Sequence, residues 1–82
     1  MTALESLYID FNEEINKNDF GNKRWEDDSY AYMTLVVETY DIDKTIKNRI
    51  FEILDDKSVS LPIAYMNVCQ YLYLIIAGEE QK

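Results

Sequence analysis

The length and charge of this chain exclude several classes of protein. Its 82 residues allow one domain, spanning residues 1–82, with one modest core, and its 48% hydrophobic content is too high for an intrinsically disordered chain. Sixteen Asp and Glu residues against eight Lys and Arg give a net charge of −8, which argues against direct binding to nucleic acid or to anionic membranes. An electrostatic partner is therefore expected to be a basic protein.

The first predicted helix covers residues 3 to 17. Its apolar residues recur at intervals of three and four, and they are Leu4, Leu7, Tyr8, Phe11 and Ile15. Thr2 followed three places later by Glu5 fits a capping box, in which hydroxyl and carboxylate satisfy the free amides of the first turn. The N-terminus lacks the basic start and apolar run of a secretory signal, so a cytoplasmic location is expected.

Residues 18 to 28 are polar around Gly21, and they are predicted to form a long loop. Trp25 in this loop has two interpretations: it covers the end of the core, or it anchors a partner, because Trp, Tyr and Arg dominate interface hot spots. We expect the best candidate surface for partner binding here, comprising Arg24, Trp25, Glu26, Asp27, Asp28, Tyr30 and Tyr32.

The second segment, residues 29 to 40, is ambiguous, because its β-branched and aromatic residues also suit a buried strand. Helical spacing of Met33, Val36, Val37 and Tyr40 favours a helix, with Asp28 or Ser29 as its cap. A lone strand would have no partner strand.

A third helix is predicted over residues 43 to 56, capped by Asp41 or Asp43. Its apolar stripe consists of Ile42, Ile46, Ile50, Ile53 and Leu54. Two hydrophobic residues lie away from the main stripes of their helices, Ile9 in the first helix and Phe51 in the third, and they either are covered by neighbouring helices or belong to an interface.

Residues 61 to 78 are the longest apolar stretch and carry no charge. At about 27 Å such a helix is almost long enough to span a membrane, but its tyrosines are spread along it, and Asn67 and Gln70 would lie at mid-depth. A core helix is therefore preferred, with Pro62 in its first turn and Gly78 as its stop.

This last helix has two apolar sides. The wide side predicted to be buried consists of Leu61, Ala64, Tyr65, Val68, Cys69, Leu72, Ile75 and Ile76. The opposite side carries Ile63, Asn67, Gln70 and Leu74, a mixed strip that either is covered by neighbouring helices or meets another chain, including a second copy. Cys69 is the only cysteine and is expected to be a small buried hydrophobe.

Catalytic and metal-binding signatures are weak. The chain has no His, and its single Cys makes neither a catalytic triad nor a zinc site. Asp41, Asp43, Thr45 and Glu52 fit part of a calcium-binding loop, but Ile46 stands where that loop requires Gly, so helix capping is the better interpretation. No enzyme activity, cofactor or metal is expected.

The sequence therefore predicts an all-α, four-helix bundle-like domain with the C-terminal helix most buried. The predicted function is stoichiometric binding of a basic protein target, as in inhibitors, immunity proteins or phage anti-defence proteins, where charge steers encounter and aromatic residues hold the complex. Two alternatives stay open: imitation of DNA toward a nucleic-acid-binding protein, and a structural homodimer built on the strip from Ile63 to Leu74.

Overall fold

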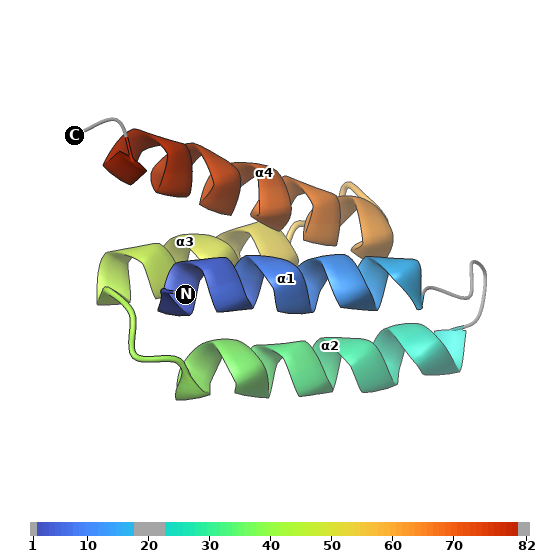
Figure 1. Ribbon diagram of the computed structural model, residues 1–82. Coiled ribbons are helices and arrows are strands. Elements are labelled where there is room, and N and C mark those ends of the chain that lie inside the picture. Colours follow the sequence, from blue (N-terminus) through green and yellow to red (C-terminus); the bar gives the residue numbers. More distant parts are fainter. Residues whose placement is uncertain (1, 18–22, 81–82) are drawn as a thin grey trace.

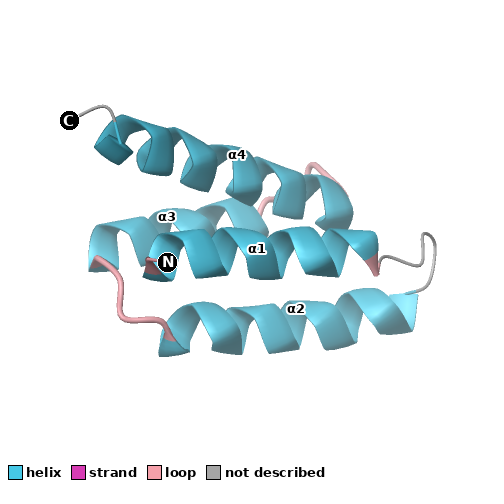
Figure 2. Ribbon diagram, viewed as in Figure 1, coloured by secondary structure: helices cyan, strands magenta, loops and turns pink. Residues whose placement is uncertain are grey.

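The computed structural model describes residues 2–17 and 23–80. Within these ranges the chain forms four helices, α1 (Ala3–Asn16), α2 (Lys23–Thr39), α3 (Lys44–Leu54) and α4 (Leu61–Glu80), joined by loops and turns (Figures 1 and 2). This arrangement confirms the predicted all-α four-helix bundle.

The helices run up and down in chain order, so that each one is roughly antiparallel to the next (Figure 1). α4 packs against α1 and α3, and α2 packs against α1 and α3, which gives an elongated body of 41 × 24 × 20 Å. Short connections between α2, α3 and α4 favour antiparallel neighbours of this kind.

α1 begins as the sequence predicts. The Thr2 hydroxyl accepts a hydrogen bond from the Glu5 amide at 3.2 Å, and the Glu5 carboxylate accepts one from the Thr2 amide at 3.4 Å. This reciprocal capping box satisfies two amides of the first turn. The buried side of α1 then presents Leu4, Leu7 and Phe11 to the core.

α2 is longer than predicted. The segment predicted over residues 29 to 40 is helical as far as Thr39, as preferred, but the helix begins at Lys23, so the predicted loop over residues 18–28 is wrong from residue 23 onward. The rest of that loop, residues 18–22, lies outside the described residues. Neither Asp28 nor Ser29 is a cap, because both lie inside the helix and Ser29 is buried.

α3 begins at the predicted cap. The Asp43 carboxylate accepts a hydrogen bond from the Thr45 amide at 2.7 Å. Ile50 and Leu54 are its buried residues. Phe51, which lies off the main stripe of α3, is half-buried against the core. Ile9, off the main stripe of α1, is exposed.

α4 contributes more buried side chains than any other described helix. Tyr65, Val68 and Leu72 are fully buried and Cys69 is nearly so, which confirms the predicted wide inner side. Burial raises the pKa of the Cys69 thiol to about 11, so the thiol stays protonated at neutral pH. Gly78 does not end the helix, which continues to Glu80.

The core is a single cluster drawn from all four helices. Its largest fully buried side chains are Leu7, Phe11, Met33, Val37, Ile50, Tyr65, Val68 and Leu72. At about 1.5–3 kcal/mol for each fully buried large apolar side chain, this cluster supplies most of the driving force for folding.

The stretch Leu61–Gly78 is long and apolar enough to cross a membrane, and one third of it is buried inside the bundle. Core helices of soluble proteins meet the same criterion of length and composition. The remaining outer side of α4 faces away from the other helices and carries the exposed residues Ile63, Met66, Tyr73 and Leu74.

Candidate functional site

Trp25 lies on the first turn of the extended α2, where it is half-buried against the core. Its ring packs edge-on against Tyr65 of α4, with 6.4 Å between the ring centroids. Tyr65 also meets Phe11 of α1 edge-on at 5.3 Å. Trp25 therefore covers the end of the core from a helix, where the sequence predicted a loop.

A buried polar contact lies beside these rings. The Ser29 hydroxyl donates to the Glu14 carboxylate at 3.0 Å and lies 2.8 Å from the Tyr65 hydroxyl, so one serine links α1, α2 and α4. Lys17 lies 3.6 Å from the other oxygen of Glu14. Burial is the main cause that raises the pKa of Tyr65 to about 12.

The helical conformation divides the predicted partner-binding residues between two sides of α2. Trp25, Asp28 and Tyr32 line a shallow groove against α1, together with Lys17 and the buried Glu14 and Ser29. Arg24 is exposed and forms an ion pair with Asp28 at 3.9 Å. Glu26, Asp27 and Tyr30 face the other way, so these seven residues do not form one surface.

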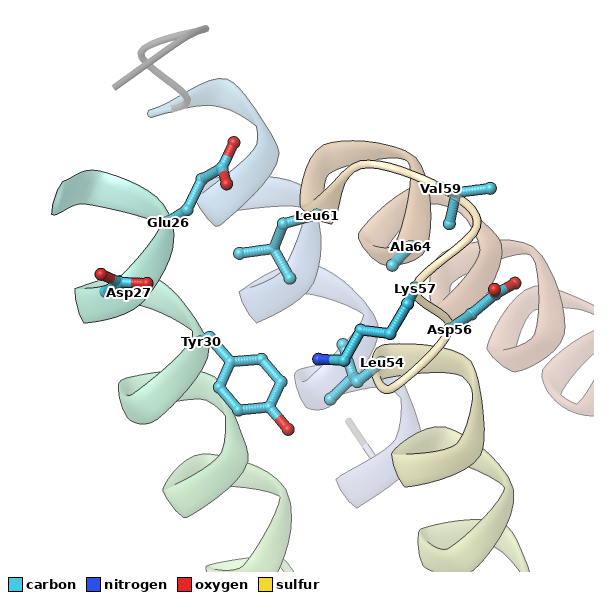
Figure 3. A pocket seen from close by; sticks show the side chains of 9 residues that line it. All are labelled: Glu26, Asp27, Tyr30, Leu54, Asp56, Lys57, Val59, Leu61 and Ala64. Atoms are coloured by element: carbon cyan, nitrogen blue, oxygen red, sulfur yellow. The ribbon is translucent and has the colours of Figure 1, made fainter. Parts of the chain in front are cut away.

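Glu26, Asp27 and Tyr30 instead form one wall of a cleft of about 300 Å³, which we call the acidic cleft. The connection between α3 and α4 supplies the opposite wall. Figure 3 shows the nine lining residues, which are Glu26, Asp27, Tyr30, Leu54, Asp56, Lys57, Val59, Leu61 and Ala64. Asp56 and Val59 lie on the connection, with side chains that point away from Tyr30 (Figure 3).

Tyr30 is held in the acidic cleft by a hydrogen bond and by a nearby cation. Its hydroxyl donates a short hydrogen bond to the carboxylate of Asp55, at the end of α3. This hydrogen bond is the main reason that the pKa of Tyr30 is raised. The ammonium group of Lys57 lies over the Tyr30 ring, 5.9 Å from its centroid, which is a cation–π geometry (Figure 3).

Negative charge dominates the walls of the acidic cleft. Glu26, Asp27 and Asp56 line it, Asp55 adjoins it through Tyr30, and Lys57 is the only cation among its lining residues. Hydrogen bonds from the hydroxyl and amide of Ser58 lower the pKa of Asp56, which keeps that carboxylate ionised. Leu54, Leu61 and Ala64 add an apolar surface.

The predicted strip on the outer side of α4 is exposed. Ile63 and Leu74 are 43% and 63% exposed, and Asn67 and Gln70 are exposed with them. Met66 and Tyr73 are exposed on the same side of α4, and the predicted strip did not include them. Helical spacing alone does not show which side chains the neighbouring helices leave exposed to solvent. The α4 strip therefore consists of Ile63, Met66, Asn67, Gln70, Tyr73 and Leu74.

One flank of the α4 strip borders a groove of about 540 Å³ against α3. Asn67, Gln70 and Leu74 line it from α4, beside the less exposed Tyr71. The α3 side supplies Arg49, Glu52, Ile53 and Asp56, and Arg49 forms an ion pair with Glu52 at 3.0 Å.

Within residues 2–17 and 23–80, no group of three or more His, Cys, Asp or Glu side chains is arranged to hold a metal ion. Comparisons with protein-family models, with curated proteins and with solved structures found no match to this chain.

Proposed function

We propose that this protein is a small acidic binding module, which associates stoichiometrically with a basic protein target and acts by occupying it. Inhibitors, immunity proteins and phage anti-defence proteins work in this way. The protein would act without catalysis and in the cytoplasm.

The observation that carries this proposal is the combination of surfaces in the acidic cleft. A Lys or Arg side chain has an apolar stem and a charged head, and it binds best where both are matched. The half-buried Leu61 offers contacts for the stem, while Glu26 and Asp27 offer carboxylates for the head. The Tyr30 ring, which already accepts the ammonium group of Lys57, adds a cation–π surface.

The net charge of −8 supports the same partner. A protein this small with so large a charge attracts basic partners over roughly one Debye length, about 8 Å at physiological salt. Such attraction mainly raises the association rate. A basic target would therefore bind quickly and in a salt-dependent manner.

The acidic cleft can be tested by NMR titration of the protein with an arginine-rich octapeptide. We expect amide shifts centred on Tyr30, Leu61 and Ala64. The double variant Glu26→Gln/Asp27→Asn should lose these shifts and bind about tenfold more weakly, because two charge-assisted hydrogen bonds to the guanidinium group are removed.

The matched control is Glu13→Gln/Glu38→Gln, which removes the same charge from exposed positions on α1 and α2 outside the acidic cleft. It should bind the peptide almost as well as the unchanged protein. Equal weakening by both double variants would show attraction to net charge only and would contradict the assignment of the cleft.

The inhibitory role requires a real target. Affinity purification from the source cell should recover a basic protein in a one-to-one complex, and its association rate should fall as salt rises. An uncharged or acidic partner, or a salt-independent rate, would contradict the proposed function.

A further inference from the structure

We propose that the α4 strip is the interface of a two-fold symmetric homodimer, in which two copies of α4 pack face to face and antiparallel. This inference goes beyond the proposed function and does not depend on it. It commits the strip to one occupant, a second copy of this chain.

The α4 strip is a continuous uncharged surface, in which the apolar side chains Ile63, Met66, Tyr73 and Leu74 surround the amides of Asn67 and Gln70. At about 100° per residue, its six residues fall within an arc of about 120° on one side of the helix. Met66, Tyr73 and Leu74 are each more than half exposed. Scattered exposed hydrophobes are ordinary on monomers, but a continuous strip along a helix marks an interaction surface.

Charge also favours a second copy at this face. The sequence from Leu61 to Gly78 contains no charged residue, although the whole chain carries −8. Two acidic molecules repel each other wherever their carboxylates approach. The α4 strip is where two copies can approach without bringing carboxylates of α4 together.

The order of residues along the strip is self-complementary. Asn67 and Gln70 are equidistant from the point midway between Val68 and Cys69, and so are Ile63 and Leu74. A two-fold axis that crosses between two antiparallel helices at this point places Ile63 opposite Leu74 of the second copy. It also places Asn67 opposite Gln70 of the second copy, where two amides can exchange hydrogen bonds.

This matching is what a two-fold interface demands, since each residue must suit the one it meets on an identical surface. Apolar contacts at the two ends supply affinity. A pair of amides at the centre fixes the register, because any shift leaves buried amides without partners.

The groove against α3 extends the complementarity. α3 runs antiparallel to α4, so Asp56 lies toward the start of α4 and Arg49 lies toward Leu74 (Figure 1). In a dimer with this two-fold axis, the groove of one copy faces the groove of the other, and the two grooves run in opposite directions. Arg49 of one copy therefore lies at the end where the second copy has Asp56, while Glu52 of each copy lies near the axis, held by Arg49 of its own chain.

Two helices alone bury less than the roughly 1,200 Å² of a standard interface. The two grooves add the α3 walls, so the dimer uses two helices from each copy. We expect a dissociation constant in the micromolar range, about −8 kcal/mol.

Sedimentation equilibrium of the full chain tests the dimer. At high micromolar concentration the mass should be twice the 9.7 kDa of one chain. Leu74→Glu should give a monomer with an unchanged circular dichroism spectrum, since Leu74 is 63% exposed. Leu35→Glu is the matched control, because Leu35 is 59% exposed on α2, and this variant should stay dimeric.

Cross-linking tests the antiparallel register. The double variant Ile63→Cys/Leu74→Cys should form disulfide-linked dimers under mild oxidation, whereas Ile63→Cys alone should not, because its two copies would lie about 16 Å apart along the helix. A monomer at high micromolar concentration overturns the proposal, as does a dimer that Leu74→Glu leaves intact. Binding of liposomes through the strip would also overturn it.

Discussion

Ser29 shows how one small side chain can link three helices. Its hydroxyl donates to Glu14 on α1 and lies beside the Tyr65 hydroxyl on α4, and all three groups are buried. A carboxylate this deep is costly unless it receives hydrogen bonds. Ser29 and Lys17 together provide that compensation for Glu14.

Ser29→Ala should destabilise the protein by about 1–3 kcal/mol, because both Glu14 and Tyr65 lose a buried partner. The melting temperature should fall by roughly 4–8 °C for each kcal/mol in a domain of this size. Urea denaturation at neutral pH provides the measurement.

Ser6→Ala is the matched control, since Ser6 lies on α1, is not fully buried and makes no side-chain hydrogen bond that the structure shows. It should be neutral or slightly stabilising, because Ala favours the helix. Equal stability of Ser29→Ala and the unchanged protein would contradict the linking role of Ser29.

The sequence could not reveal this role. A serine before an apolar run has the same local signature whether it caps a helix or bonds a distant carboxylate. Glu14 likewise resembles any charged residue on the outer side of an amphipathic helix. Only the packing of α1, α2 and α4 brings the three groups together.

Helices α1, α3 and α4 were predictable because their apolar residues keep a three- and four-residue spacing. The start of α2 was not, since the polar residues 23 to 28 resemble a loop in composition. Lys, Arg and Glu nevertheless favour helices, and acidic residues stabilise the first turns by interacting with the helix dipole. Trp25 packing on Tyr65 adds tertiary support for these turns.

Gly78 was predicted to end α4, yet the helix continues through it. A Cβ atom at this position would meet nothing within 4 Å. Gly78→Ala should therefore stabilise the protein, because Ala loses less backbone entropy on folding. The gain should be at most about 0.5–1 kcal/mol, since Gly78 lies near the end of the helix. Thermal unfolding followed by circular dichroism should show a rise of a few degrees.

Ala77→Gly is the reciprocal control on the neighbouring residue and should lower the melting temperature. A fall with Gly78→Ala would mean that the last turns of α4 are not helical in solution.

At the scale of the whole molecule, tyrosine hydroxyls connect all four helices. Tyr40, just after α2, donates to Asp10 of α1 at 2.6 Å, and Tyr30 of α2 donates to Asp55 at the end of α3. Tyr65 of α4 meets Ser29 of α2. The pKa of each of these hydroxyls is raised, to about 12 for Tyr40 and Tyr65.

These shifts predict a loss of stability in alkali. A tyrosine with a raised pKa holds its proton more tightly in the folded state, so its contribution is complete below the unfolded pKa of about 10 and is lost as pH rises toward 12. The urea midpoint should therefore fall between about pH 10 and about pH 12.

Tyr40→Phe separates the loss of stability caused by tyrosine ionisation from the repulsion among the negative charges of the chain. The variant should be less stable at neutral pH, because the hydrogen bond to Asp10 is gone, yet its stability should fall less steeply in alkali. An identical slope for both proteins would show that Tyr40 does not contribute to the alkaline loss.

The candidate site was only partly predictable at this scale. Composition predicts a basic partner, which stays a prediction, and helical spacing gave four residues of the α4 strip. The acidic cleft was not predictable, because Lys57, Leu61 and Ala64 come from the α3–α4 connection and from α4. These residues are far from Tyr30 along the chain, with the whole of α3 between them. Their meeting depends on how α2 lies against the end of α3.

The position of Lys57 over the Tyr30 ring has a consequence for selectivity. If a partner's cation uses this ring, it must first displace a cation that belongs to the protein itself. A tethered group competes at an effective concentration of roughly millimolar or above. Free amino acids and polyamines would therefore be rejected at ordinary cellular levels, whereas a folded target that makes further contacts at the same time could displace Lys57.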